Sequence, residues 1–509
     1  MKSLVNTAVR QYLKFKKPRV RDLRYEAVKL QSVILQQIIK QGSQTVYGKN
    51  HHLNKLRSQK DFQSAVPVNS YEDLEPLIKR TMMGEQNLIS SEKINWFAKS
   101  SGTTNSKSKY IPVSKKYLFN NHIQGNWDAV SFIYEQIPGA EIFSRKNLLM
   151  GGTIEAYSHN PNVMVGDITG IMIKHIPAIG RPFYTPDFDT ALMKNWDEKI
   201  EKMAKIVSAE DVHLVAGVPT WSIVLFNKIL EVTGKSNILD VWPNAIAYVH
   251  GGVHFGPYKA QFKNYFPSES FKYLEGYNAS EGYIALQDDF NRDDMLLLCG
   301  NENYFEFIEL EGYQKGKTNC ISLEDVELGK VYVLIMSNAS GLWRYTIGDT
   351  VRFTSLSPYR IQVAGRTKQF INAFGEELMV HNVESALSKV CTKLDIVIND
   401  YTIAPYYMDG LSKGRHDWFV EYIKPPNDPI VFSNLLDQEL QNVNSDYEAK
   451  RFKDLALSKL CIHELPQGTF EKWYRKKDKF GSQNKVPRLS NDRQIIEELL
   501  ELERPVRFY

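Results

Sequence analysis

A run of small polar residues with two lysines is the first stretch whose residue types could do chemistry. It reads Ser100-Ser101-Gly102-Thr103-Thr104-Asn105-Ser106-Lys107-Ser108-Lys109. Small residues free backbone N–H groups to point at an anion, the hydroxyls add donors, and the lysines supply the charge that a polyphosphate needs. The run lacks the spacing of a Walker loop. Because serine, threonine, asparagine and glycine are also ordinary turn residues, a polar hairpin loop explains this stretch equally well.

A second candidate motif is Tyr277-Asn278-Ala279-Ser280-Glu281, which combines an aromatic ring, an amide, a hydroxyl and a carboxylate. An aromatic ring can stack on a nucleotide base, and a carboxylate that faces phosphates requires a divalent cation between them. The plainer interpretation is a polar turn between a strand and a helix, in which Ser280 or Asn278 only caps the helix.

Asp349 and Arg366 are candidates for contacts to a nucleotide. Asp349 follows Gly348 at the end of an expected strand, where its carboxylate could accept hydrogen bonds from both hydroxyls of a ribose. An ordinary Gly-Asp turn is the simpler interpretation of that pair alone. Arg366 could hold a phosphate or a ribose, or it could pair with a carboxylate on the surface.

His250 and His254 lie four residues apart, a spacing that can place two metal ligands on one face of a helix. Gly251 and Gly252 lie between them and break a helix, so we expect no metal pair here. The two histidines are expected to flank a ligand site instead, with His254 as a candidate contact to a substrate.

The composition limits the class of protein. A chain of 509 residues is too long for one ordinary core and predicts two or three domains. Its 43% hydrophobic and 24% charged residues are typical of a soluble globular protein, and a formal net charge of +4 argues against a nucleic-acid binder. No apolar run approaches the roughly 20 residues that span a bilayer, and the N-terminus lacks the apolar stretch of a signal peptide. The cysteines show no metal-ligand spacing and fit a reducing compartment, so we expect a cytoplasmic protein; they are Cys299, Cys320, Cys391 and Cys461.

The hydrophobic pattern predicts the elements that position these residues. Strands are expected on either side of the polar loop, and beyond it strands and helices alternate. The expected strands are 94–98, 110–113, 147–150, 212–216, 245–249 and 271–275, and the expected helices are 22–42, 70–80, 191–207 and 219–231. Such alternation predicts a largely parallel sheet covered by helices, with ligands at the carboxyl ends of the strands. Residues 250–252 and 277–282 each follow a strand and are expected at that edge.

After Met295 the pattern changes to short alternating strands, which predict antiparallel hairpins and a small β-barrel-like part. The expected strands are 296–299, 304–308, 331–336 and 351–353. Further helical and strand patterns at 381–390, 396–402 and 418–423 predict a smaller α+β domain. The expected fold class is therefore α/β, with a large N-terminal domain at residues 1–365 and a mobile C-terminal domain at residues 366–509. A short joint between them predicts two domains that swing against each other.

Taken in order, the motifs resemble those of the adenylate-forming superfamily of ATP-dependent carboxylate-activating enzymes. The order is a Ser/Thr-Gly-Lys loop, Tyr-x-x-Ser-Glu-Gly, Arg-Tyr-x-x-Gly-Asp and Gly-Arg-x-Lys. Within that superfamily the chain looks like the auxin-responsive-promoter family of acyl-acid amido synthetases, in its bacterial form. The resemblance runs from Thr45-Val46-Tyr47-Gly48 to Asn484-Lys485-Val486-Pro487-Arg488, and four motifs in order are specific where any single one is weak.

The resemblance implies a role for each motif in binding ATP and Mg²⁺. The polar loop would hold the phosphates, Tyr277 and the backbone that follows it would hold adenine and the α-phosphate, and Asp349 would bind the ribose with support from Arg366. Glu281 matches the carboxylate that binds Mg²⁺ in the family. The implied nucleotide contacts are Ser100, Ser101, Thr103, Thr104, Gly252, Tyr277, Asn278, Ala279, Ser280, Asp349 and Arg366.

Three lysines would carry the chemistry by the same resemblance. Lys109 and Lys485 would offset the charge of the phosphates, and Lys368 falls at the hinge of the C-terminal domain. Lys479 is a rival to Lys485 within the same basic segment.

The acyl group would lie against the helix that starts at Pro219. Trp221 and Leu225 are the side chains expected to contact it, although both are read more simply as core residues. His254 is the third expected contact to a substrate.

The function implied is activation of a carboxylic acid as an acyl adenylate with release of pyrophosphate, followed by transfer to an amino acid to form an amide. A ligase that passes the acyl group to coenzyme A, and a non-catalytic nucleotide-binding module, are the alternatives. The expected partners are a small carboxylic acid and an amino acid, with no nucleic acid and no stable membrane insertion, and the chain is expected to act as a monomer.

Overall fold

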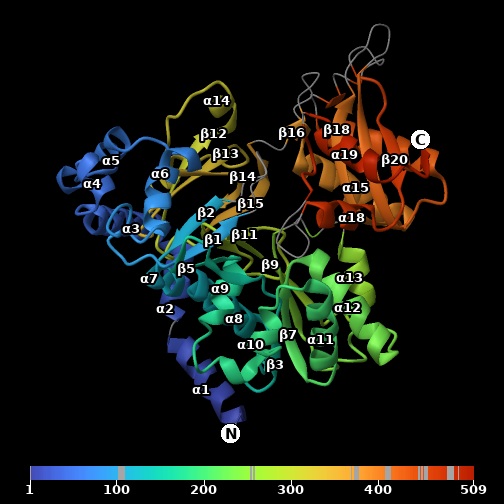
Figure 1. The fold of residues 1–509 in the computed structure, drawn as a ribbon, viewed down its shortest axis with the longest axis horizontal. Coiled ribbons are helices and arrows are strands. Elements are labelled where there is room, and N and C mark those ends of the chain that lie inside the picture. The colour runs from blue at the N-terminus through green and yellow to red at the C-terminus, as the bar shows by residue number, and fades with distance from the viewer. Residues whose placement is uncertain are drawn as a thin grey trace. The chain divides into compact units, whose positions relative to one another are not determined.

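The computed structural model describes residues 2–15, 17–100, 109–252, 255, 258–367, 370–371, 378–406, 414–444, 447–448, 451, 457–477, 486–490 and 492–509. The chain forms two compact units (Figure 1). Unit 1 comprises Met1–Val253 and Phe266–Gln362, and unit 2 comprises His254–Tyr265 and Val363–Tyr509. The domain boundary expected between residues 365 and 366 stays a prediction, because compactness alone does not define a domain.

One half of the large sheet in unit 1 is parallel, as the alternating pattern predicted. Each strand of this half runs parallel to its neighbour. In sheet order the strands are β6 (Tyr184–Thr185), β3 (Lys146–Leu149), β7 (Val212–Gly217), β8 (Ala247–His250) and β9 (Lys272–Ala279). Helix α11 (Trp196–Ser208) lies between β6 and β7, and α12 (Pro219–Thr233) connects β7 to β8. Proline starts α12 at a position where its missing N–H costs nothing.

The other half of the same eleven-stranded sheet is antiparallel. The strands expected as a small barrel-like part continue the large sheet, and β9 joins the two halves through its antiparallel partner β10. From β9 outward the order is β10 (Gly282–Leu286), β11 (Met295–Leu297), β15 (Tyr359–Arg366), β14 (Tyr345–Leu356), β13 (Val331–Asn338) and β12 (Asn303–Glu309).

A second, four-stranded sheet carries the flanks of the polar loop. Its order is β2 (Lys109–Val113), β1 (Trp96–Ser100), β5 (Asn160–Gly166) and β4 (Ile154–Tyr157). β1 and β2 are antiparallel, with Ser100 opposite Lys109, which confirms the two predicted strands. One apolar core links both sheets, because Phe97 and Val165 pack in the same cluster as Phe305.

Helices complete unit 1. The expected helix 70–80 is α6 (Tyr71–Met82), which starts with a capping box between Ser70 and Asp73. The expected helix 22–42 is divided at Glu26 between α2 and α3, and the expected helix 191–207 is divided between α10 and α11. The other helices are α1 (Lys2–Phe15), α2 (Lys17–Tyr25), α3 (Ala27–Gly42), α4 (Val46–Asn50), η1 (Leu53–Lys55), α5 (Gln59–Ala65), α7 (Lys115–Tyr117), η2 (Leu118–Ile123), α8 (Gln124–Gln136), α9 (Ile168–Lys174), η3 (Arg181–Phe183), α10 (Phe188–Ala191), α14 (Leu310–Gln314) and η5 (Leu323–Asp325).

Unit 2 is an α+β unit, as expected. Its sheet has the order β18 (Val397–Tyr406), β19 (Arg415–Lys424), β20 (Cys461–Leu465) and β21 (Arg507–Phe508), beside a small pair formed by β16 (Phe370–Ile371) and β17 (Leu378–Met379). Trp418 and Val420 pack on one core, and Phe419 between them packs on another, so both faces of β19 are covered. The helices are α13 (Lys259–Tyr265), α15 (Val380–Leu394), α16 (Pro429–Val443), α18 (Thr469–Lys476) and α19 (Gln494–Leu502).

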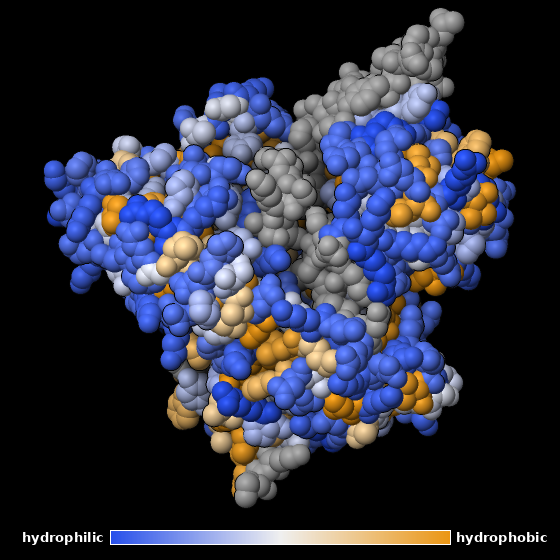
Figure 2. Space-filling view, in the orientation of Figure 1, coloured by the Kyte–Doolittle hydropathy of each residue, from blue (hydrophilic) through white to orange (hydrophobic). Residues whose placement is uncertain are grey.

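Figure 2 shows hydrophilic residues over most of the visible face, with hydrophobic residues in small groups. Among the described residues no helix is both long and apolar enough to cross a bilayer.

Candidate active site

The motif at Tyr277 lies on a β-hairpin. Tyr277, Asn278 and Ala279 are the last residues of β9, and Ser280-Glu281 is a two-residue connection to β10. The expected turn from a strand into a helix is therefore wrong. The apolar run that starts at Gly282 forms a second, fully buried strand, since it is rich in residues that pack on a pleated surface.

Glu281 is held at the tip of this hairpin. Its backbone oxygen accepts hydrogen bonds from Tyr117 Oη at 2.8 Å and from Asn338 Nδ2 at 3.4 Å. The residue is only 6% exposed. Carboxylate oxygens are ligands that Mg²⁺ prefers, so the donor at Glu281 fits the predicted metal role.

Tyr277 and Asp349 meet although 72 residues separate them in the chain. The Tyr277 hydroxyl donates a hydrogen bond to Asp349 Oδ2, and the carboxylate is buried. Two of the predicted nucleotide contacts are thus brought into one place within unit 1. This contact is the geometric core of the candidate site.

Asp349 lies inside β14, so its expected place at a strand end or turn is wrong. The pairing of β14 with β13 shifts from Thr346 opposite Ile335 to Thr350 opposite Val333. Extra residues bulge out between these pairs, and Gly348 within the bulge has a φ of +92°. Turns and bulges both favour a glycine at positive φ, so a Gly-Asp pair in the sequence does not distinguish a turn from a bulge.

The flanks of the polar loop are described, and its centre is not. Lys109 starts β2, and its Nζ lies 5.7 Å from the centre of the Tyr71 ring, a favourable cation–π distance. The Tyr71 hydroxyl accepts a hydrogen bond from the Tyr110 backbone at 3.0 Å, which fixes the start of β2. The predicted contacts Ser101, Thr103 and Thr104 lie outside the described residues, as does the side chain of Ser100.

Several other predicted site residues also lie outside the described part of the chain. They are Lys368, Lys485, its rival Lys479, and His254, together with the side chain of Arg366, whose backbone ends β15. Their roles stay predictions.

Gly251 and Gly252 follow β8 at the carboxyl edge of the parallel strands, as predicted. A Cβ on Gly251 would lie 2.2 Å from the backbone oxygen of Gly276 in β9, so only glycine allows this close approach. Gly252 has a φ of +79°. The loop therefore lies directly beside the strand that leads to Tyr277.

The predicted acyl contacts differ in exposure. Trp221 is half-buried on the first turn of α12, whereas Leu225 is fully buried. Ser222 between them shares a hydrogen bond of 2.8 Å with the Tyr248 hydroxyl, which donates to the Gly217 oxygen at 2.8 Å. These bonds fix the start of α12 against β7 and β8, and a substrate role for Trp221 and Leu225 stays a prediction.

Two buried charged residues, Lys199 and Asp167, hold the backbone of the loop after β3, and sequence reasoning did not find them. Lys199 Nζ donates to the Gly151 oxygen at 2.5 Å, and Asp167 Oδ2 accepts from the Thr153 backbone at 2.9 Å. Burial lowers the pKa of Lys199 to about 8 and raises the pKa of Asp167. A Cβ on Gly152 would lie 1.8 Å from Asp167 Oδ2, so glycine at this position leaves room for the Asp167 carboxylate. The adjacent glycines were the available signal.

The segment that follows Lys485 is anchored on α18 and β18. The Val486 N–H donates to the Tyr474 hydroxyl at 2.7 Å, and Thr402 Oγ1 donates to the Pro487 oxygen at 2.6 Å. The guanidinium of Arg488 is hydrogen-bonded to Asp400 Oδ1 and lies 4.4 Å from the centre of the Tyr401 ring. Residues 486–488 are therefore a fixed end from which the chain leads back to Lys485.

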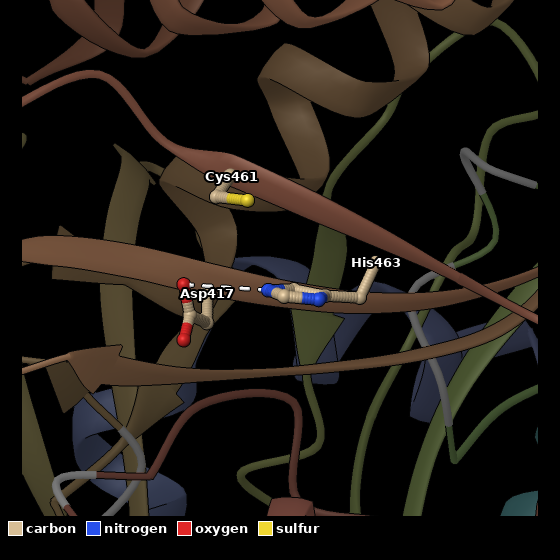
Figure 3. Close-up of side chains that lie close together, drawn as sticks. All are labelled: Asp417, Cys461 and His463. Atoms are coloured by element: carbon tan, nitrogen blue, oxygen red, sulfur yellow. Dashed lines mark ion pairs between the residues drawn. The ribbon is translucent and has the colours of Figure 1, made fainter. Parts of the chain in front are cut away.

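Asp417, Cys461 and His463 form the one group of potential metal ligands found among the described residues (Figure 3). His463 Nε2 lies 3.5 Å from Asp417 Oδ1, and Asp417 also accepts hydrogen bonds from Arg415 at 2.7 Å and from Arg493 at 3.0 Å. Burial opposes the charge on His463, but its contact with Asp417 prevails and raises the pKa of His463 to about 9. Asp417 thus pairs with His463 and with two guanidinium groups, and these contacts form an ion-pair network.

Comparison with solved structures identifies the fold. The structure matches that of AtGH3.15 acyl acid amido synthetase in complex with 2,4-DB, with a TM-score of 0.78 and 18% identity over 99% of this chain and 97% of that one. It also matches 2-hydroxyisobutyryl-CoA ligase in the postadenylation state, with a TM-score of 0.61 and 12% identity over 94% of each chain. This is the adenylate-forming fold.

The chain belongs to the GH3 family. The family's N-terminal domain matches residues 16–190 and 153–271, its central domain matches 296–366, and its C-terminal domain matches 381–494. The chain is 23% identical to indole-3-acetic acid-amido synthetase GH3.3 of Arabidopsis thaliana over 87% of this chain and 85% of that one. It is 24% identical to jasmonoyl--L-amino acid synthetase JAR6 of Nicotiana attenuata over 89% and 88%. The predicted fold class and family are confirmed.

Proposed function

We propose that this chain activates a carboxylic acid with ATP and then joins the acyl group to an amino acid through an amide bond. The contact between Tyr277 and Asp349, beside the hairpin that carries Glu281, is the observation that supports a nucleotide site. The names of the GH3.3 and JAR6 relatives, which are amido and amino acid synthetases, support the choice of acceptor.

In the first half-reaction a carboxylate oxygen attacks the α-phosphorus of ATP, and the bond to pyrophosphate breaks. An anion attacks a polyanion, so the residues of the site must offset negative charge. Lys109 and Lys485 supply positive charge, and Asp349 holds the ribose. Glu281 would hold Mg²⁺, which lowers the negative charge of the phosphates when it is bound.

In the second half-reaction the amine of an amino acid attacks the acyl carbon, the bond to AMP breaks, and the nitrogen releases a proton. In this proposal the C-terminal domain turns about Lys368 between the two steps, which withdraws Lys485 and admits the amine. A monomeric state and a cytoplasmic location stay predictions.

Exchange of labelled pyrophosphate into ATP, measured across a panel of carboxylic acids, tests the first step. We expect exchange that requires both Mg²⁺ and a suitable acid. Release of inorganic phosphate without any acid would exclude the adenylate mechanism.

A second assay then offers the activated acid either a panel of amino acids or coenzyme A, because the CoA ligase with the same fold makes a thioester the main alternative. An amide product supports the proposal, and a thioester product contradicts it.

A further inference from the structure

The helix that follows β2 contains a π-helical turn. α7, the π-helix η2 and α8 run from Lys115 to Gln136 without a break. A π-turn brings residues five apart onto one face, whereas an α-helix does so for residues three and four apart. Tyr117 and His122 accordingly meet edge to face, with ring centroids 5.6 Å apart.

Side chains from this turn hold both strands of the β9–β10 hairpin. Tyr117 bonds the backbone of Glu281 at the tip, as described above. Asn121 Oδ1 accepts from the Tyr283 N–H at 2.7 Å on β10. His122 Nδ1 lies 2.9 Å from Asn278 Oδ1 on β9. The π-turn thus reaches the hairpin at its tip and on both sides.

The hydrogen bonds of Asn278 fix the tautomer of His122. Asn278 Nδ2 lies 3.6 Å from the Met172 sulfur, which can only accept, so the amide turns its oxygen toward the histidine. With the Asn278 amide in this orientation, His122 Nδ1 carries the proton and donates it. Burial lowers the pKa of His122 to about 4, which keeps the ring neutral near pH 7 and leaves Nε2 without a proton.

Burial of the His122 ring has a cost at its second nitrogen, Nε2, so packing alone does not explain a histidine at this position. His122 is fully buried, and its Nε2 has no hydrogen-bond partner among the described residues. An unpaired buried acceptor costs about 1–3 kcal/mol, a cost that an apolar ring would avoid. The hydrogen bond from Nδ1 to Asn278 is the interaction that an imidazole can make at this position and an apolar ring cannot.

We propose that His122 is a positioning residue for the nucleotide site: its Nδ1–H holds the Asn278 amide and so aligns the hairpin that presents Asn278, Ser280 and Glu281. The proposal rests on the proposed function, because the reaction gives the alignment its purpose. The ligand of the nucleotide site is the adenosine phosphate part of ATP, and His122 acts on it indirectly, by holding Asn278 on β9.

Two substitutions of similar polarity test the position of the donor. In His122→Asn the amide N–H stands near the place of Nδ1, whereas in His122→Gln it extends to the place of Nε2. We expect pyrophosphate exchange by the asparagine variant to stay within about threefold of wild type. His122→Gln and His122→Leu should lower kcat by about 10–100-fold with little change in KM for ATP, because small misalignments are felt most in the transition state.

Asn120→Ala is the matched control, since Asn120 lies in the same π-turn, is exposed and bonds only Glu302 among the described residues. It should leave exchange unchanged. Equal rates for the asparagine and glutamine variants would overturn the proposal, and this comparison holds even if the leucine variant does not fold. Absence of exchange in the wild type would instead count against the proposed function.

A spectroscopic measurement tests the role of His122 independently of whether the protein catalyses the proposed reaction. Nitrogen NMR of protein with labelled histidine should show His122 as the neutral Nδ1–H tautomer at pH 7, and Asn278→Leu should abolish that preference. An Nε2–H tautomer in the wild type would overturn the proposal whether or not the protein is active.

Discussion

At the scale of single residues, the bond between Tyr277 and Asp349 defines what each can do. Because the tyrosine donates to Oδ2, the carboxylate of Asp349 is held in one orientation. A ribose offers two hydroxyl donors to such an acceptor. The pair therefore combines a ring for the base with an oriented acceptor for the sugar.

Asp349→Ala is expected to raise KM for ATP by about 10–100-fold and to change kcat much less. A hydrogen bond to a charged group contributes about 1.5–3 kcal/mol, and ribose contacts are made equally in the ground and transition states. Initial-rate kinetics with varied ATP measure both constants. Asp293→Ala, which removes an exposed acid from the same unit, should have no effect. A collapsed kcat with unchanged KM would show that the ribose assignment is wrong.

At the scale of elements, the β19–β20 pair carries a charge network that responds to pH. Burial favours the neutral form of Asp417, but its contacts with His463 and Arg415 prevail and lower its pKa to about 2. The pKa of His463 is raised in the folded state, so its contribution to stability is complete below pH 6.5 and is lost as the pH rises through about 9. From about pH 2, the pKa of Asp417, to about pH 9, the pKa of His463, the ion pair joins the neighbouring strands β19 and β20.

His463→Gln should lower the melting temperature by about 2–6 °C at pH 6, because the paired positive charge is lost. At pH 10 the wild-type ring is neutral as well, so the difference should largely disappear. Thermal unfolding followed by circular dichroism at both pH values measures the effect. His159→Gln, at an exposed histidine, should be neutral at either pH. A difference that persists unchanged at pH 10 would contradict the ion-pair assignment.

Element positions were predictable where apolar residues recur with a clear period. The strands beside the polar loop and the parallel strands β3, β7, β8 and β9 were predicted because each is a short apolar run between polar turns, whereas the two-residue strand β6 was not predicted. The hairpin at Ser280-Glu281 and the bulge at Gly348 were not, since the same polar residues serve turns, hairpins and bulges. The π-turn at His122 has no simple sequence signal, because it depends on the contacts of Tyr117, Asn121 and His122 with a hairpin more than 150 residues away.

At the scale of the whole molecule, the proposed reaction asks the C-terminal domain to deliver one lysine and then remove it. The anchor at residues 486–488 suits that task, since immediately after Lys485 the chain is bonded to two elements of unit 2, Val486 to α18 and Arg488 to β18. A side chain tied to a rigid unit moves as that unit moves.

Lys485→Ala is expected to slow pyrophosphate exchange by about 10²–10³, the usual cost of one preorganised charge donor. It should convert a synthetic acyl adenylate and an amine at close to the normal rate, because the lysine acts only in the first step. Separate assays of the two half-reactions measure this split, and Lys479→Ala is the control expected to show no loss. Equal damage to both steps in a folded protein would contradict the domain swing.

The side-chain bonds of Gln31 have a consequence for how the chain folds as it is made. Gln31 in α3 donates to the backbone oxygens of Cys299 and Asn303, which follow 268 and 272 residues later. Ribosomes add about 5–20 residues per second, so roughly 15–50 seconds pass between the synthesis of Gln31 and that of its two hydrogen-bond partners. Until β12 has been synthesised, α3 lacks a strand that it packs against. The large sheet is complete only after β15 has been synthesised. Until then, the nascent N-terminal half exposes apolar surface that can aggregate or bind a chaperone.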